Sequence, residues 1–283
     1  KRYLLSEFLS NSIKRDELLF FSIGMLKELG IKLRKGEHVK TIEPLKKLIK
    51  LHHNEVMHYD KLLIATGGSP SLGLVLRPYK KHISFYSSLY DTLVLKEKLP
   101  EIRKCIVFGN GVSCLDLICM LRNLGKQVTY ITKEEQATFA LNEYDFEGEL
   151  HTFLEEKGIE IITEDQIVLI EESDNGYKVE TIQQKMLTTD IVFAWDFYKP
   201  NIACIEDSAI EKKTGILVNV RLETSEKDIY AAGDCVEIYH PCLKNYWINF
   251  GLPNALEQGK IAGKNMLGQN EEYKIQEAIV FNL

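Results

Sequence analysis

Hydrophobic and polar residues change pattern several times in the middle of the chain. Residues 105–108 form an apolar run, which ends at the turn Gly109-Asn110-Gly111. Apolar residues then recur at helical spacing over 112–121, and a second apolar run, 128–131, follows Gly125. Short apolar runs bounded by glycine indicate strands, whereas the helical repeat indicates an amphipathic helix. The segment therefore predicts a strand–helix–strand unit.

Similar patterns predict further elements on both sides of this unit. Apolar residues at helical spacing predict helices over residues 15–29, 90–99, 145–157 and 251–263. Short apolar or alternating runs predict strands over residues 31–34, 38–42, 47–51, 55–58, 59–67, 160–162, 167–171, 178–181, 190–194, 215–220 and 228–232. Strands that alternate with helices are typical of an α/β fold.

The turn at residues 109–111 has the composition of a phosphate-binding loop. Glycines let the backbone approach a diphosphate, and the following helix N-terminus supplies unpaired N–H groups and a partial positive charge. The third position of the G-x-G-x-x-G pattern is Cys114, a small residue. Because the turn lies between a strand and a helix, we predict a dinucleotide site here; a glycine turn used only for tight packing is the alternative.

Two other stretches narrow the class of protein. Residues 59–70, YDKLLIATGGSP, form a strand that ends in Ala-Thr-Gly, and residues 228–237, DIYAAGDCVE, form a strand that ends in Gly233-Asp234. With the central unit, in this order and spacing, they make the chain resemble the FAD-dependent pyridine nucleotide-disulfide oxidoreductases. It is most similar to NADH:rubredoxin reductases, NADH oxidases and the flavin portion of NAD(P)H nitrite reductases. The resemblance covers nearly the whole chain.

The resemblance implies an α/β fold with two Rossmann-like dinucleotide-binding domains of the three-layer ββα type. An NAD(P)H domain, residues 99–216, is expected as an insertion in a FAD domain made of residues 1–98 and 217–283. The family's first βαβ unit, which cradles the FAD diphosphate, is expected upstream of residue 1. The C-terminal interface domain of the relatives is expected to be missing.

The resemblance also implies the flavin contacts. Asp234 suits a hydrogen bond to a ribityl hydroxyl, although a turn-forming aspartate would look the same in sequence. The helix over residues 251–263 is expected to point its N-terminus at the pyrimidine end of the flavin, where its dipole stabilises negative charge. The expected FAD-binding residues are Arg2, Val39, Ala65, Thr66, Gly67, Gly233, Asp234, Leu252 and Pro253.

The nicotinamide dinucleotide is expected on the central unit. Asp116 stands where relatives carry a glutamate that faces the carboxamide. At the end of the second strand an acidic residue binds the ribose 2′-hydroxyl of NAD, whereas a cation tolerates the 2′-phosphate of NADP. Thr132-Lys133 occupies that position, so NADPH or weak discrimination is at least as well supported as NADH. The expected residues are Gly109, Gly111, Val112, Ser113, Asp116, Thr132 and Lys133.

Two departures from the family pattern keep other hypotheses open. Phe197 replaces the glycine of Ala-x-Gly-x-x-Pro-Asn, so it would crowd the dinucleotide or stack on it. With Trp195 and Tyr198 it would alternatively form an interaction surface or pack in the core. Glu7 replaces a lysine that pairs with the flavin N5 region in several relatives. The alternatives are a degenerate, non-catalytic nucleotide-fold module and an electron-transfer subunit completed by another polypeptide.

Composition excludes several other classes. The chain has 283 residues, of which 45% are hydrophobic and 27% charged, enough for two domains. Its net charge of -6 disfavours nucleic-acid binding. No apolar run reaches the length of a membrane span, so we predict a cytoplasmic protein with no membrane partner. The six cysteines form no C-x-x-C pair or zinc-like quartet, so neither a redox disulfide nor a metal site is expected.

The sequence therefore predicts a flavin-dependent NAD(P)H oxidoreductase. Hydride would pass from NADH or NADPH to FAD, and electrons would then reach an external acceptor such as rubredoxin, oxygen or a nitrite-reductase-type partner. An electron-acceptor protein and a second copy of the chain in a homodimer are the expected protein partners. No residue is assigned as a catalytic acid or base.

Overall fold

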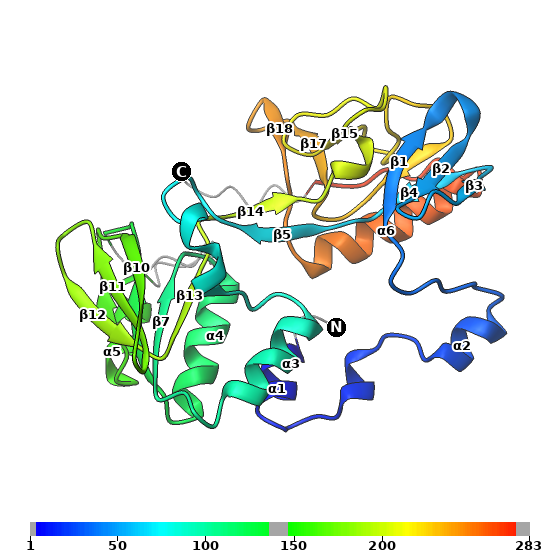
Figure 1. The fold of residues 1–283 in the computed structure, drawn as a ribbon. Coiled ribbons are helices and arrows are strands. Elements are labelled where there is room, and N and C mark those ends of the chain that lie inside the picture. Colours follow the sequence, from blue (N-terminus) through cyan, green and yellow to red (C-terminus); the bar gives the residue numbers. More distant parts are fainter. Residues whose placement is uncertain (1–3, 136–146, 276–283) are drawn as a thin grey trace. The chain divides into compact units, whose positions relative to one another are not determined.

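The computed structural model describes residues 4–135 and 147–275 (Figure 1). The described residues form two compact units: 4–32, 70–135 and 147–198 make unit 1, and 33–69 and 199–275 make unit 2. The predicted domains are defined by the cofactor that each is expected to bind, whereas these units are defined by which residues pack together. The boundaries of the units therefore differ from those of the predicted domains. The assignment of one cofactor to each domain stays a prediction.

Unit 1 is organised around a five-stranded parallel sheet of order β6-β13-β7-β8-β9. Helix α4 joins β7 to β8, which confirms the predicted strand–helix–strand unit. The central strands β7 and β13 are buried on both faces, as is usual for parallel sheets. The elements of this sheet are β6 (Ile83–Ser84), β7 (Lys104–Phe108), α4 (Val112–Asn123), β8 (Gln127–Ile131), β9 (Glu160–Ile162) and β13 (Ile191–Ala194).

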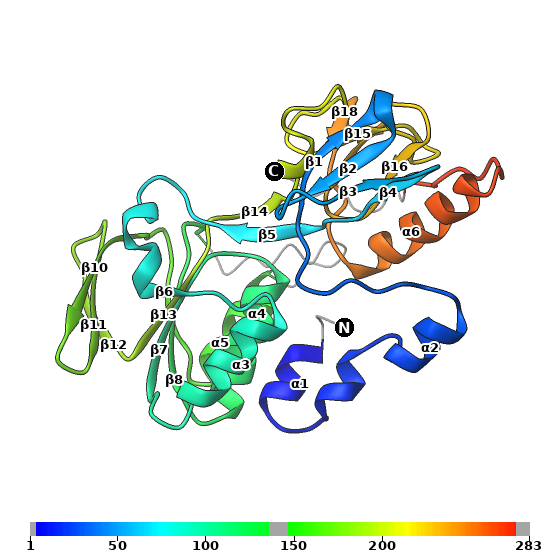
Figure 2. The same cartoon turned by 45° about the vertical axis from the view of Figure 1, so that its right-hand side comes forward.

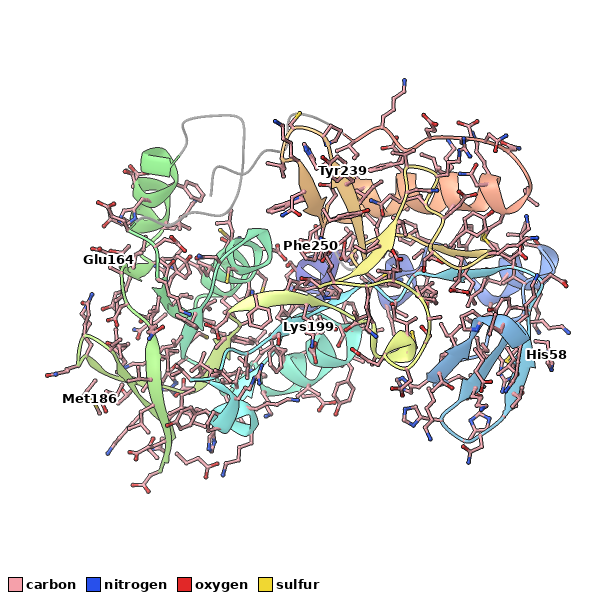
Figure 3. All side chains as sticks on the ribbon, turned by 90° about the horizontal axis from the view of Figure 1, so that it is seen from above. His58, Glu164, Met186, Lys199, Tyr239 and Phe250 are labelled. Atoms are coloured by element: carbon pink, nitrogen blue, oxygen red, sulfur yellow. The ribbon has the colours of Figure 1, made fainter. Side chains whose placement is uncertain are left out.

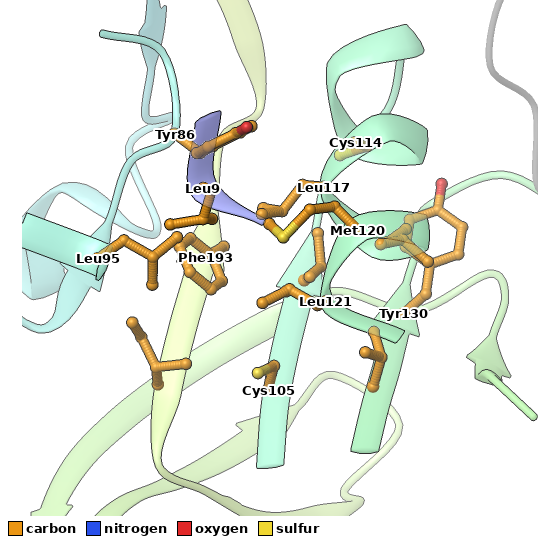
Figure 4. Close-up of a cluster of buried hydrophobic side chains, with 14 of the residues drawn as sticks. Leu9, Tyr86, Leu95, Cys105, Cys114, Leu117, Met120, Leu121, Tyr130 and Phe193 are labelled. Atoms are coloured by element: carbon orange, nitrogen blue, oxygen red, sulfur yellow. The ribbon is translucent and has the colours of Figure 1, made fainter. Parts of the chain in front are cut away.

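Helices cover one face of this sheet. Side chains alternate along β7, so that Cys105 and Val107 face the helices. Leu117 and Leu121 of α4 pack with Phe193 of β13 in the cluster drawn in Figure 4. The remaining helical segments of unit 1 are α1 (Leu5–Leu9), η2 (Arg15–Leu18), α2 (Ile23–Glu28), η4 (Arg77–His82), α3 (Leu89–Lys98) and α5 (Glu147–Glu156).

A three-stranded antiparallel sheet covers the other face. It consists of β10 (Ile167–Ser173), β11 (Gly176–Thr181) and β12 (Met186–Thr189). Ile106 and Phe108 of β7 pack in the same core as Val179 of β11. Figure 2 shows the resulting sheet–sheet–helix layers, with the exposed residue Met186 labelled on this outer sheet in Figure 3. Unit 1 therefore has the predicted three-layer ββα arrangement.

Unit 2 is assembled from small sheets around a second core. One is the predicted antiparallel meander, one is the parallel pair β4–β16, and the third contains β15, β17 and β18. The long helix α6 packs on β16. The elements are β1 (Val39–Glu43), η3 (Pro44–Lys46), β2 (Leu48–Leu51), β3 (Val56–His58), β4 (Leu62–Ile64), η5 (Ala203–Ile205), β15 (Ile216–Val218), β16 (Ile229–Ala231), β17 (Val236–His240), β18 (Asn245–Trp247) and α6 (Leu252–Met266).

Two paired strands carry the chain from one unit to the other. They are β5 (Gly68–Ser71) and β14 (Phe197–Pro200), which form a two-stranded sheet (Figure 1). The backbone N–H of Asp196, just before β14, donates to the carbonyl of Ser71. Phe197 of β14 is 44% exposed, whereas Trp195 is buried in the core of unit 1. The aromatic cluster predicted from the sequence therefore divides into a core residue, Trp195, an exposed residue, Phe197, and a half-buried residue, Tyr198.

Two predicted elements near the N-terminus are wrong. In place of one helix over residues 15–29, the chain forms the short segments η2 and α2, separated by extended backbone at Leu19. No residue of α2 is buried, and Ile31 and Leu33, in the predicted strand at 31–34, are half exposed in irregular backbone. Helices and strands gain most of their stability from burying an apolar face, and the described residues leave these faces uncovered.

None of the helices in the described part of the chain combines the length and the apolar character needed to cross a bilayer.

Candidate functional site

The turn between β7 and α4 has a backbone shape that glycine favours. Gly109 has a φ of +136° and Gly111 a φ of +94°. A Cβ on Gly109 would lie 2.4 Å from the carbonyl oxygen of Trp195, so a side chain would push apart the ends of β7 and β13. A Cβ on Gly111 would meet no atom within 4 Å. The turn is therefore tightly packed at its first glycine and open at its second.

Helix α4 begins directly at this open position. Gly111 is its N-cap and has no side chain to cap the N–H groups of the first turn, of which that of Cys114 donates to the Gly111 carbonyl at 2.9 Å. Val112 and Ser113 form the first helical turn, as predicted; their side chains lie outside the described part of the structure. Exposed N–H groups and the helix dipole favour an anion at this end. The geometry fits the diphosphate of a dinucleotide.

Strand β8 fixes the shape of the turn through Asn110. The hydroxyl of Tyr130 donates within 3.0 Å of both the Gly109 carbonyl and Asn110 Oδ1. Thr132 Oγ1 donates to the same Asn110 oxygen at 2.8 Å, and Asn110 Nδ2 donates to Glu134 Oε1 at 3.3 Å. Burial raises the pKa of Tyr130, so its hydroxyl keeps its proton. Thr132 is fully buried, and its hydroxyl stabilises the turn by donating to Asn110. Its contact with NAD(P) stays a prediction.

The lysine at the end of β8 is paired with a carboxylate. Lys133 Nζ lies 2.6 Å from Asp196 Oδ1, and Asp196 Oδ2 accepts a hydrogen bond of 2.7 Å from the Gly73 N–H. These two charged side chains line a cavity of about 30 Å³ together with Phe108, Gly109 and Asn110. Sequence analysis missed Asp196, because its partners Lys133 and Gly73 lie far away along the chain.

Asp116 is held by the hydroxyl of Ser6, a residue that the sequence analysis did not single out. Ser6 Oγ of α1 donates to Asp116 Oδ2 at 2.5 Å and lies 2.9 Å from the hydroxyl of Tyr86. Partial burial is the main cause that raises the pKa of Asp116; the charge of Glu7 acts in the same direction and the Ser6 hydrogen bond opposes it. The residue expected at the nicotinamide end is therefore tied to α1 within unit 1.

In unit 2, Asn201 holds the Ala-Thr-Gly turn that follows β4. Its Nδ2 donates to the Thr66 carbonyl at 3.1 Å, and its backbone N–H donates to the Gly67 carbonyl at 2.9 Å. In return Thr66 Oγ1 donates to the Asn201 carbonyl at 2.6 Å. Ala65 and Thr66 remain exposed, as an edge that contacts a cofactor requires. Asn201 is a second residue that sequence analysis did not assign.

The Gly-Asp turn after β16 meets the N-terminus of α6. Asp234 Oδ1 accepts a hydrogen bond of 3.0 Å from the N–H of Gly251, the residue that precedes α6. The N–H of Gly233 donates to the buried Gln258 Oε1 at 2.7 Å, which ties the turn to the middle of the helix. The structure thus brings together four of the predicted flavin residues, Gly233, Asp234, Leu252 and Pro253.

Val39 and Arg2 complete the set of predicted flavin residues. Val39 opens β1, pairs with Leu51 and is 37% exposed. Arg2 lies outside the described residues. The histidines near the meander, His52, His53 and His58, are exposed, and His58 is labelled in Figure 3. Among the described residues, no cluster of three or more His, Cys, Asp or Glu side chains could hold a metal ion.

Comparison with known proteins identifies the family. The sequence profile of the family described as pyridine nucleotide-disulphide oxidoreductase matches residues 1–261. The chain belongs to this family. This membership confirms the resemblance inferred from the three glycine-containing stretches, and with it the α/β fold with two Rossmann-like domains.

Curated relatives include two bacterial electron-transfer proteins. The nitric oxide reductase FlRd-NAD(+) reductase of Klebsiella pneumoniae subsp. pneumoniae is 27% identical, over 98% of this chain and 71% of the relative. The assimilatory nitrate reductase electron transfer subunit of Bacillus subtilis is 28% identical, over 96% of this chain and 35% of the relative. The chain therefore spans most of the first protein and about a third of the second.

Solved structures with a similar fold include two further reductases. NADH:rubredoxin oxidoreductase from Clostridium acetobutylicum matches with a TM-score of 0.78 and 26% identity, over 97% of this chain and 67% of that one. The covalent putidaredoxin reductase–putidaredoxin complex matches with a TM-score of 0.86 and 22% identity, over 95% of this chain and 67% of that one. The second likeness concerns the fold alone.

Proposed function

We propose that this protein is a flavin-dependent NAD(P)H oxidoreductase that passes hydride from NAD(P)H to FAD and electrons to an external acceptor. The family supplies the two cofactors, FAD and NAD(P)H. The observation in the structure that supports the nicotinamide site best is the β7–α4 turn. There Gly111 leaves open space beside an uncapped helix N-terminus.

The chain's own residues bind and orient the cofactors, which supply the hydride chemistry. The turn at Gly109–Gly111 and the first residues of α4 would hold the nicotinamide dinucleotide by its diphosphate. Asp116, fixed by Ser6, would orient the carboxamide end. In unit 2, Asp234 and the N-terminus of α6 would hold the flavin, since a helix N-terminus stabilises negative charge.

The electron acceptor that we propose is a small redox protein. The relatives are named as reductases or electron-transfer subunits of nitric oxide, nitrate, rubredoxin and putidaredoxin systems, and one was crystallised covalently joined to putidaredoxin. The six cysteines lie as free thiols, and electron transfer without an internal disulfide stays a prediction from their spacing in the sequence. A homodimer and a cytoplasmic location stay predictions from the sequence.

The visible absorption spectrum of the purified protein tests this function. We expect flavin absorption bands that are retained through gel filtration and that bleach when NADH or NADPH is added without oxygen. A protein that is colourless, that does not take up added FAD and whose spectrum no nicotinamide nucleotide changes would contradict the proposal. That result would favour the non-catalytic nucleotide-fold module.

A further inference from the structure

Lys133 is the residue that sequence analysis linked to NADPH, and the structure shows that its charge is already engaged. Its Nζ lies 2.6 Å from Asp196 Oδ1, and the side chain of Lys133 is 49% exposed while that of Asp196 is only 10% exposed. The lysine is the exposed member of the pair, and the aspartate is the nearly buried one.

Asp196 is held in place from two sides. Its second carboxylate oxygen accepts the Gly73 N–H at 2.7 Å, and its backbone N–H donates to the Ser71 carbonyl at 3.0 Å. A Cβ on Gly73 would lie 2.9 Å from Asp196 Oδ2, so the backbone there closes directly over the carboxylate. Asp196 therefore cannot turn away from Lys133 without leaving the Gly73 N–H unpaired.

Two further acidic residues, Glu134 and Glu135, follow the same end of β8 in the sequence. Asn110 Nδ2 holds the side chain of Glu134 at 3.3 Å, beside the phosphate-binding turn, and Glu135 follows in sequence. A 2′-phosphate at this end would have to compete with Asp196 for one lysine and would meet like charges. A nearly buried carboxylate that loses its ion-pair partner is strongly destabilised. A ribose 2′-hydroxyl meets no such cost, because it can donate to a carboxylate.

We propose that Asp196 determines nucleotide specificity, by holding the Lys133 ammonium so that the end of β8 accepts a ribose 2′-hydroxyl and the protein prefers NADH. Asp196 is a positioning residue, since it acts through Lys133. The inference rests on the proposed function, which puts the dinucleotide on the β7–α4 turn. It reverses the interpretation of Lys133 from sequence, where the lysine was considered without its partner.

Steady-state kinetics of the flavin-loaded protein with a small artificial acceptor tests this inference. Asp196→Asn keeps the side-chain volume and removes the charge, so we expect kcat/KM for NADPH relative to NADH to rise about 10-fold, through the KM for NADPH. Asp196→Glu, which keeps the charge, should retain the NADH preference. Lys133→Met alone should leave the ratio within about 2-fold of the native value, because the native lysine does not contribute to phosphate binding.

The double variant Asp196→Asn with Lys133→Met tests whether the effect of Asp196→Asn depends on Lys133. We expect it to return the ratio to the native value, because the gain in Asp196→Asn comes from the released lysine. An unchanged ratio in Asp196→Asn would overturn the inference, and so would a loss of NADPH use of about 10-fold in Lys133→Met alone. Lys133→Met leaves the Asp196 carboxylate without its ion-pair partner, so its melting temperature is measured alongside the kinetics. If either single variant is unstable, the native protein decides the question, because use of NADPH as readily as NADH would overturn the inference.

Calorimetry with adenosine 2′,5′-bisphosphate and 5′-AMP separates this inference from the proposed function. Native protein should bind 5′-AMP more tightly, and Asp196→Asn should gain affinity for the bisphosphate. If native protein and variant bind 5′-AMP equally and neither distinguishes the two ligands, only the specificity inference fails. If native protein binds neither ligand and does not oxidise NADH, the proposed function fails and the inference fails with it.

Discussion

The two units support their candidate cofactor turns in different ways. In unit 1 the Gly109–Gly111 turn ends a central strand of a five-stranded parallel sheet, and the neighbouring strand β8 contributes the hydroxyls that fix it. In unit 2 the two turns end a parallel pair, β4 and β16. They are held by long-range hydrogen bonds, one donated by Asn201 Nδ2 and one accepted by Gln258 Oε1. An isolated parallel pair has little stability of its own. The shape of the turns thus depends on a sheet in unit 1 and on a few side chains in unit 2.

Because the turns are supported differently, we predict that single substitutions weaken cofactor binding through packing in unit 1 and through lost hydrogen bonds in unit 2. We expect the largest effect from Gly109→Ala. Its Cβ would lie 2.4 Å from the Trp195 carbonyl at a φ of +136°. Such backbone strain costs about 1–3 kcal/mol before the steric clash is added. Thermal unfolding should show the loss of stability, and titration with NADH should show loss of binding.

Gly176→Ala is the matched control for this substitution. Its Cβ would lie 2.2 Å from the Thr189 carbonyl in the β11–β12 region, far along the chain from the turn. It should lower the melting temperature as Gly109→Ala does and leave the affinity for NADH unchanged. Equal losses of NADH binding in both variants would mean that the turn has no specific role.

Asp234→Ala should have the next largest effect and should act on the flavin alone. The substitution removes the acceptor for the Gly251 N–H at the start of α6 and the carboxylate expected at the ribityl chain. Losing a hydrogen bond to a charged group costs about 1.5–3 kcal/mol, so we expect FAD to dissociate at least about 10-fold more readily. Flavin content after gel filtration measures this directly.

Asp234→Asn separates the two roles of the side chain. It keeps an acceptor for the Gly251 N–H and loses the charge, so its flavin content should lie between those of the native protein and Asp234→Ala. If both variants retain flavin at the native level, Asp234 does not contact it and is only a turn-forming residue.

Smaller effects are expected from one substitution in the turn of each unit, and the two variants together compare the turns. Asn201→Ala removes the Nδ2 hydrogen bond to the Thr66 carbonyl, whereas Thr132→Val removes one of two hydroxyls that donate to Asn110 Oδ1. We expect FAD affinity to fall a few-fold in Asn201→Ala, as for the loss of about 1 kcal/mol, and NADH affinity to change less in Thr132→Val. The reverse order would show that the turn in unit 1 is the weaker of the two.

The smallest expected effect concerns thiols, because each unit buries a cysteine beneath its turn. Cys114 Sγ lies 3.4 Å from the position of a Cβ on Gly109, and Cys235 donates to the Ala232 carbonyl in unit 2. Burial raises the pKa of both thiols, so the reactive thiolate stays scarce as the pH rises through neutrality. The exposed Cys242 should therefore react with iodoacetamide much faster than Cys114 and Cys235 at about pH 8.

Mass spectrometry after brief labelling checks this prediction. Cys242→Ser should remove the rapid label, and unfolding in urea should make the buried thiols reactive as well. Rapid modification of Cys114 or Cys235 in the native protein would show that one of the turns opens readily, and the unit in which this occurs would be the less stable one.

Local patterns predicted the parts of the molecule whose partners are close in sequence. The β7–α4–β8 unit and its glycine turn follow from apolar spacing over about one βαβ unit. The residues that complete the sites do not, because Asp196 meets Lys133, Asn201 meets Thr66 and Ser6 meets Asp116 only after the chain has folded. No local sequence pattern predicts a contact between residues that lie so far apart along the chain.

The errors near the N-terminus have a related cause. The apolar spacing over residues 15–29 is helical, yet the structure breaks it into η2 and α2, where Leu18 is buried and Phe21 and Leu29 are exposed. A sequence pattern shows which face of a helix would be apolar, but not whether another element covers it. Without a covering element, a short segment buries too little apolar surface to offset the unfavourable free energy of starting a helix.

The order of the chain also bears on how the protein is made. Unit 1 residues 70–198 lie between the two halves of unit 2, so Leu62 of β4 leaves the ribosome long before its partner Ile229 of β16. Strands β7 and β8, by contrast, are separated by one helix and can pair at once. Contacts distant in sequence form late. During translation, strand β4 therefore stays without its partner strand until β16 has been synthesised.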